Sequence, residues 1–437
     1  MRSGLSIFLA AVFCLCMLAP AGSGLAQEEA ENEQRTKRVQ AMSERVHRRL
    51  SKAIEAMNAE DYVTAESLLN EVLELRNLTP YERAQTIRYV GFVHYYTEDY
   101  PAAIQTFLEI SRMGGPEDIP GIYEEAIRFL SQLYLSEENY REAIRFGEMS
   151  LELMEDPTPV DYVRMAQAHL QLEQWRDALD YLSTAIEKAQ AIGEEVPESW
   201  WRNMVSAHWE LEQYPEALDV TKILLAQWPK KQFWTTMSGL YGILEDEPRQ
   251  LAAYWCAYEQ GMFSTSSELV NMAQLFLLAE VPYRGALILD EGLENGSIER
   301  NTRNYRLTAQ AWQMAREDRR ALDPMRKAAE SEEDAEDKGE LYVRLAETYN
   351  AVRDHEGCAS AARQALGVGE LKSEGRTNLL LGQCLLEQEE FNEAGDAFER
   401  ALRDRDTRRE AAQWQNYLEI EVKRRQKLEA DLAELAN

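Results

Sequence analysis

Residues 100–110 read YPAAIQTFLEI, and the order of large and small side chains in this stretch decides the fold. An aromatic residue is followed three positions later by a small one, with clear copies at Tyr62/Ala65, Tyr100/Ala103, Tyr140/Ala143, Trp175/Ala178, Tyr214/Ala217, Tyr283/Ala286 and Phe391/Ala394. Weaker copies stand at Glu247/Gln250, Asp318/Ala321 and His355/Cys358. The copies follow one another at steps of 33 to 40 residues. A fixed period in this range predicts an array of structural repeats.

Each repeat reads as two antiparallel helices with interlocking side chains. In the second repeat a small residue, Gly91, stands nine positions before the anchor Tyr100, and a ring, His94, stands six before it. Phe107 and Ile110 follow the anchor at helical spacing. The large side chain of one helix therefore faces the small one of the other.

This pattern resembles the tetratricopeptide repeat, whose consensus places tryptophan, leucine, glycine, tyrosine, alanine and phenylalanine at these offsets. The resemblance implies an all-α fold, a right-handed α-solenoid of about ten helix pairs with capping helices at both ends. We predict a signal peptide over residues 1–26, an N-terminal helix or cap over 27–58, the repeat array over 59–405, and a C-terminal capping helix and tail over 406–437. Trp414, Leu418 and Val422 are expected to seal the last repeat.

The first residues have the layout of a secretory signal. Arg2 precedes an apolar run from Leu5 to Leu18, and a small-residue region ends at Ala26, where we expect cleavage. The apolar run is too short to span a membrane comfortably. After cleavage the sequence predicts no membrane span.

Export makes the cysteines informative. Beyond the signal there are three, Cys256, Cys358 and Cys384, and this odd number excludes a dense disulfide framework. A bond between Cys358 and Cys384 is geometrically conceivable. The preferred interpretation is that both are buried small hydrophobic residues.

The net charge of −30 argues against nucleic acid as a partner, since phosphate binding relies on lysine and arginine. An acidic array suits a basic protein partner, but it also simply keeps a protein soluble.

Catalytic chemistry is not indicated. His94, His169 and His208 take the ring position of their repeats, and no HExxH, GxSxG, Walker or dinucleotide-binding motif is present. We therefore expect no enzyme activity, no metal and no cofactor.

The resemblance implies a binding surface on the first helix of each pair, which lines the concave side of tetratricopeptide arrays. The positions there that interlocking does not use are Arg88, Phe92 and Tyr95 in the second repeat, Arg202, Ser206 and Trp209 in the fifth, and Arg303, Arg306, Gln310 and Gln313 in the eighth. Arginines and aromatic residues often anchor bound peptides. The alternative for each arginine is that it covers a neighbouring helix.

Three segments, beginning PESWWRNMVSAHW at Pro197, WPKKQFWTTMSGLYG at Trp228 and VPYRGALILDEG at Val281, depart from the generic consensus. They resemble tetratricopeptide proteins encoded beside the TonB, ExbB and ExbD genes of Gram-negative bacteria. That resemblance implies a periplasmic scaffold in a TonB-type system for outer-membrane import of iron complexes, with periplasmic segments of TonB- or ExbD-like proteins as partners. The alternatives are an envelope-assembly scaffold for polysaccharide export or peptidoglycan machinery, and a carbohydrate-binding array.

Overall fold

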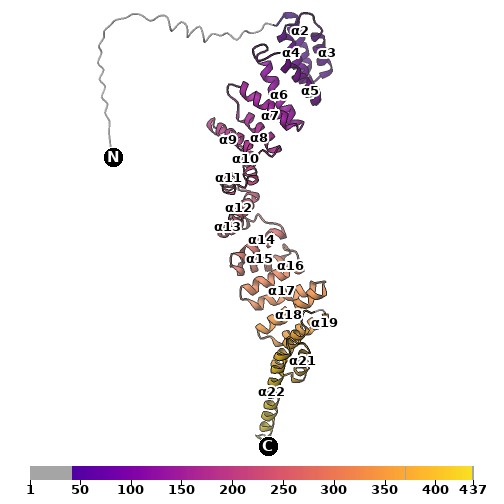
Figure 1. Cartoon of the computed structure of the whole chain (residues 1–437), viewed down its shortest axis with the longest axis vertical. Helices are drawn as coiled ribbons and strands as arrows, with labels where there is room; N and C mark the ends of the chain where they lie inside the picture. The colour runs from indigo at the N-terminus through magenta and orange to yellow at the C-terminus, as the bar shows by residue number, and fades with distance from the viewer. Residues whose placement is uncertain (1–41, 370, 436–437) are drawn as a thin grey trace, which may run out of the picture. The chain divides into compact units, whose positions relative to one another are not determined.

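The computed structural model describes residues 42–369 and 371–435, and every regular element in these ranges is an α-helix (Figure 1). The signal peptide predicted over 1–26 lies outside the described residues. The chain divides into two compact units between Pro157 and Thr158. This boundary falls inside the range 59–405 predicted for the repeat array, in the connection between two helix pairs.

The first unit contains three helix pairs, in which each helix contacts the next along the chain. They are α2 (Glu44–Asn58) with α3 (Tyr62–Leu73), α4 (Pro80–Tyr96) with α5 (Tyr100–Met113), and α6 (Ile122–Ser136) with α7 (Tyr140–Leu153). The residues predicted as an N-terminal helix or cap thus supply α2, which packs as the first helix of the first pair.

The second unit contains seven further pairs and a terminal helix, again with each helix in contact with the next. They are α8 (Pro159–Gln171) with α9 (Trp175–Ala191), α10 (Glu198–Glu210) with α11 (Tyr214–Gln227), α12 (Lys231–Ile243) with α13 (Glu247–Glu259), α14 (Ser266–Leu278) with α15 (Pro282–Asn295), α16 (Thr302–Met314) with α17 (Asp318–Ser331), α18 (Ala335–Ala351) with α19 (His355–Val368), and α20 (Glu374–Glu387) with α21 (Phe391–Arg403), followed by α22 (Arg408–Leu435). The predicted all-α array of about ten helix pairs is confirmed.

The interlocking of large and small side chains is also confirmed. A Cβ atom added at Gly91 would lie 2.8 Å from Cζ of Phe107, and one added at Gly382 would lie 2.5 Å from Cε1 of Phe398. Both phenylalanines are fully buried. The absent side chain lets the two helices of a pair approach until the ring of one touches the backbone of the other.

The turn inside every pair contains a residue other than glycine with positive φ. These residues are Glu60, Glu98, Glu138, Glu173, Glu212, Glu245, Glu280, Arg316, Arg353 and Glu389, each two positions before the second helix. The N–H of the following residue closes the first helix, as in the bond of 2.9 Å from Asp99 to the carbonyl of His94. A left-handed conformation costs an L-residue about 1–2 kcal/mol. Packing of the two helices therefore imposes the turn, and its left-handed residue is a glutamate in eight of the ten pairs and an arginine in the other two.

The buried carboxylate of Glu82 links the start of α2 to the second helix pair. Glu82 on α4 is 3% exposed and accepts hydrogen bonds from the N–H and Oγ of Ser43, at 2.8 and 2.6 Å, and from the N–H of Thr79 at 2.9 Å. Burial acts to raise its pKa, but the hydrogen bonds from Ser43 and Thr79 prevail and lower the pKa to about 2. The carboxylate thus satisfies backbone donors at the start of both α2 and α4.

The terminal helix α22 seals the last pair, as predicted from its packed stripe. Leu418 is 6% exposed, and Trp414 and Val422 pack against the same core. The indole of Trp414 stacks on Phe398, with ring centroids 6.2 Å apart.

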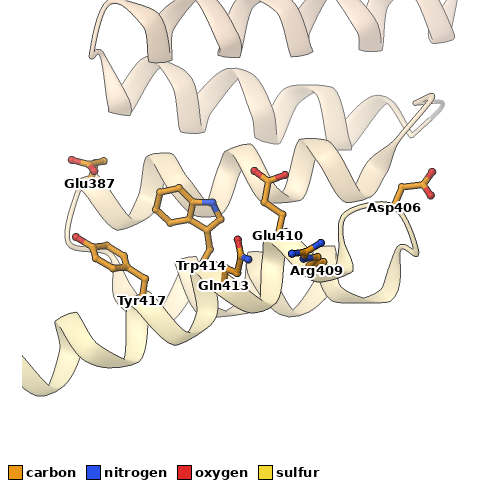
Figure 2. Close-up of a pocket in the computed structure, with 7 residues that line it drawn as sticks. All are labelled: Glu387, Asp406, Arg409, Glu410, Gln413, Trp414 and Tyr417. Atoms are coloured by element: carbon orange, nitrogen blue, oxygen red, sulfur yellow. The ribbon is translucent and has the colours of Figure 1, made fainter.

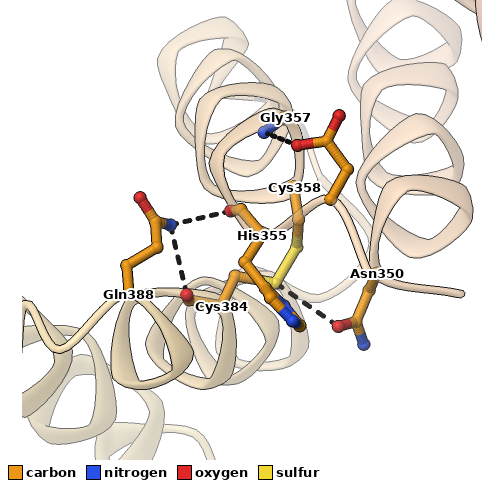
Figure 3. The surroundings of a disulfide bond; sticks show 7 residues. Asn350, His355, Gly357, Cys358, Cys384 and Gln388 are labelled. Atoms are coloured by element: carbon orange, nitrogen blue, oxygen red, sulfur yellow. Dashed lines mark hydrogen bonds between the residues drawn. A yellow bond between two sulfur atoms is a disulfide. The ribbon is translucent and has the colours of Figure 1, made fainter. Parts of the chain in front are cut away.

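The preferred interpretation of Cys358 and Cys384 as unbonded residues is wrong, because the two form a disulfide between α19 and α20 (Figure 3). Both cysteines are fully buried, and their Cα atoms are 6.1 Å apart, a separation that a disulfide spans readily. Beside the bond, Nε2 of Gln388 donates to the carbonyls of His355 and Cys384, at 2.7 and 3.1 Å. The disulfide therefore joins the ninth pair to the tenth covalently.

Candidate functional site

The three residues predicted in the second repeat lie together on α4, but only one is exposed. Arg88 forms an ion pair of 2.7 Å with Glu125 of α6, and its guanidinium lies 5.7 Å from the centroid of Phe92. Phe92 in turn packs edge-on against Phe129, at 5.0 Å. Tyr95 is 39% exposed. Arg88 therefore joins two first helices, as the alternative for the arginines stated, and Tyr95 remains accessible to a partner.

The residues predicted in the fifth repeat form an open face on α10. Arg202, Ser206 and Trp209 follow the spacing i, i+4 and i+7, which places them on one side of a helix, and all three are exposed. The indole of Trp209 stands edge-on to the ring of Tyr214, with centroids 5.7 Å apart. This contact fixes the orientation of a ring that a partner can reach.

In the eighth repeat, Arg303, Arg306 and Gln310 are exposed on α16. Gln313 is half-buried and donates from Nε2 to Oγ1 of Thr348 on α18, at 3.0 Å. Gln313 thus joins the first helices of two neighbouring pairs, as Arg88 does in the first unit. Arg88, Phe92 and Gln313 therefore contact the first helix of the next pair, whereas the predicted residues of the fifth repeat form an exposed face.

The structure adds a groove beside α22 that the sequence analysis missed (Figure 2). It has a volume of about 790 Å³ and is lined by Glu387, Asp406, Arg409, Glu410, Gln413, Trp414 and Tyr417. Figure 2 shows Trp414 and Glu410 directed from α22 toward the neighbouring helix, with Glu387 at one end of the groove and Asp406 at the other. Tyr417 is 48% exposed. A floor of two aromatic rings with charged groups at the rim suits an apolar side chain carried by a polar chain.

A sequence signal for this groove existed. Arg409, Gln413 and Tyr417 follow the spacing i, i+4 and i+8 on one side of the helix after the last repeat. The stripe of Trp414, Leu418 and Val422 predicts only a core role for Trp414. In the structure the indole of Trp414 stacks on Phe398 and also lines the groove.

The histidines take part in packing and hydrogen bonding. Nδ1 of His169 lies 2.7 Å from Oε1 of Gln174, and Nδ1 of His208 lies 2.8 Å from Oε1 of Gln213. In both cases a first-helix ring bonds to the turn that follows it. Within residues 42–369 and 371–435, no group of three or more histidine, cysteine or acidic residues is arranged to hold a metal ion.

A smaller pocket of about 410 Å³ lies between α15 and α17 and collects charged groups. Burial, and after it the nearby carboxylate of Glu294, raises the pKa of Asp290. Asp323 forms ion pairs with Arg326 and Lys327, at 2.5 and 2.7 Å. These ion pairs lie within the single helix α17, and the pocket brings no nucleophile and base together.

A family model described as tetratricopeptide repeat matches residues 163–231, which run from α8 to the start of α12. No curated protein matches the chain. Among solved structures, a tetratricopeptide repeat protein from Parabacteroides merdae is 13% identical and has a TM-score of 0.35, covering 69% of this chain and 99% of that one. The TPR2AB domain of yeast Sti1, in its complex with pHSP90, is 14% identical with a TM-score of 0.33, covering 63% of this chain and 99% of that one. MamA from Desulfovibrio magneticus is 12% identical with a TM-score of 0.35, covering 43% and 96%.

Proposed function

We propose that this chain, an all-α stack of tetratricopeptide repeats, is a scaffold that binds other proteins in the periplasm. The observation that carries the proposal is the groove on α22, where two aromatic rings and four charged side chains line an open surface beside the last helix pair. Arrays of this kind present extended surfaces to their partners. Aromatic residues and arginine are enriched among the side chains that dominate protein interfaces.

Two features support export to the periplasm. The N-terminal residues follow the layout of a cleavable signal, and the Cys358–Cys384 disulfide is of a kind that persists in oxidising compartments. In the described part of the chain no helix is long and apolar enough to cross a membrane. The mature protein is then expected to begin at Gln27, which mass spectrometry of the periplasmic fraction checks.

The partner we propose is a periplasmic segment of a TonB- or ExbD-like protein, so that the scaffold serves outer-membrane import of iron complexes. The resemblance of the segments beginning at Pro197, Trp228 and Val281 supports this assignment; they supply α10 to α13 and α15. The net charge of −30 favours partners with basic segments.

Pull-down of the mature protein with the periplasmic parts of TonB- and ExbD-type proteins, at low and high salt, tests the proposal. We expect retention at low salt that weakens as salt screens the charges. Tyr417→Ala should reduce retention, whereas Ile420→Ala, at a residue on α22 that is 62% exposed and does not line the groove, should not. Absence of retention at low salt refutes the TonB assignment, and equal effects of the two variants refute the role of the groove.

A further inference from the structure

Four tyrosines form a connected strip at one end of the first two helix pairs. The ring centroids of Tyr62 and Tyr96 are 5.9 Å apart, those of Tyr96 and Tyr95 are 5.6 Å apart, and those of Tyr95 and Tyr100 are 5.9 Å apart. Tyr96 is 56% exposed and Tyr95 is 39% exposed. We call Tyr62, Tyr95, Tyr96 and Tyr100 the tyrosine strip.

The hairpin turns bring these rings together. Tyr95 and Tyr96 are the last residues of α4, while Tyr62 and Tyr100 are the first residues of α3 and α5. Tyr62 and Tyr100 are half-buried and pack against their cores. The exposed rings of Tyr95 and Tyr96 contact these two packed rings, which hold them in place.

Carboxylates border the strip on both turns. The sequence Glu-Asp-Tyr occurs at 60–62 and again at 98–100, and Glu60, Asp61, Glu98 and Asp99 are all exposed. Glu60 and Glu98 are the residues with positive φ, at 58° and 61°, so the hairpin geometry fixes their place. Neither turn contains a basic residue.

We propose that the tyrosine strip is a docking site for an extended, proline-rich and basic segment of a protein partner. Proline rings pack on exposed aromatic rings, and a proline-rich chain is already extended in solution, which lowers the entropy lost on binding. Lysine or arginine side chains of such a segment meet the four carboxylates. Steps of 5.6–5.9 Å between rings correspond to about two residues of a polyproline II helix, which rises 3.1 Å per residue.

The orientation of the rings favours this occupant over a sugar. Tyr95 is inclined by 69° to Tyr96 and by 50° to Tyr100. Rings inclined in this way make no flat platform on which a pyranose could stack, whereas they offer edges and faces to successive turns of an extended peptide. The inference rests on the proposed function in one respect, namely that the partner is a protein.

The test measures fluorescence anisotropy of labelled peptides added to the full mature chain. A peptide of alternating lysine and proline should bind, and its affinity should fall as salt rises. Peptides of alternating glutamate and proline, or lysine and alanine, should bind at least tenfold more weakly. The double variant Tyr95→Ala/Tyr96→Ala should lose at least tenfold in affinity. The matched control is Leu278→Ala, because Leu278 is also the last residue of a first helix and is 55% exposed.

Equal binding of the three peptides, or no binding of the lysine and proline peptide, overturns the inference. So does unchanged affinity in the double variant, or competition by neutral oligosaccharides. Circular dichroism of the variants confirms that the helices are kept. If the lysine and proline peptide does not bind but the unaltered chain retains an ExbD-type domain without a proline-rich run, the proposed function stands and only the strip is refuted. If the unaltered chain retains neither the TonB-type nor the ExbD-type parts, the proposed function itself is refuted.

Discussion

Replacing Glu82 with glutamine should release α2 from α4. The carboxylate accepts three hydrogen bonds, two from Ser43 at the start of α2 and one from the backbone of Thr79 at the start of α4. An amide of the same shape has one acceptor oxygen, and its NH2 group would face an N–H donor. The variant therefore leaves a partly buried donor without a partner.

The magnitude follows from the lowered pKa. The pKa of Glu82 falls from 4.5 to about 2, and each unit is worth about 1.4 kcal/mol, so the folded state favours the ionised form by roughly 3 kcal/mol. Because the folded pKa lies below the unfolded one, this stabilisation is present above about pH 4.5 and is lost as the pH falls toward 2. About 3 kcal/mol corresponds to a change of roughly a hundredfold in the fraction of molecules with α2 open.

Hydrogen exchange of peptides from α2 measures that fraction directly, which is needed because repeat arrays open locally rather than all at once. At pH 7, Glu82→Gln should speed exchange in α2 strongly and leave α20 unchanged. Glu44→Gln is the control, since Glu44 pairs with Arg48 on an exposed surface where an ion pair contributes little. Rates corrected for intrinsic exchange should approach one another in wild type and variant as the pH drops toward 2. Equal protection at pH 7 would refute the reasoning.

Two further predictions concern packing and covalent linkage. Gly382→Ala should lower the thermal midpoint, at a cost of about 1–3 kcal/mol, because its Cβ would press on Phe398, whereas Gly239→Ala, within α12 and with no atom within 4 Å, should raise the midpoint slightly. A lower midpoint for both variants would contradict this distinction. Reduction of the Cys358–Cys384 bond should destabilise the last pairs by about 3 kcal/mol, since it closes a segment of 26 residues. Alkylation should label one thiol in the mature chain before reduction and three after it; labelling of all three beforehand would disprove the bond.

Prediction of the fold succeeded even where the repeat is degenerate. Asp318 and His355 lack the anchor aromatic, yet α17 and α19 begin at these residues. The spacing between repeats was sufficient to locate these helices, because each helix must place its small and large residues opposite those of its neighbour.

Prediction of the candidate site was less complete, because the exposure of a side chain depends on which residues of neighbouring helices contact it. Arg88 and Arg202 occupy the same position in their repeats, but Glu125 pairs with the first and Arg202 is exposed. The tyrosine strip does not follow from the pattern of one repeat, because its rings belong to two helix pairs. Tyr62 was assigned as an anchor of one repeat and Tyr95 as a surface residue of the next.

The sequence by itself determined the helical pairing, the places where second helices begin and the sealing role of Trp414, since these depend on the spacing of side chains along one chain. Only the tertiary structure decided the disulfide, the left-handed residues at the turns and the groove beside α22. Each of these depends on the distance between atoms in different helices, and the packing of the helix pairs sets that distance.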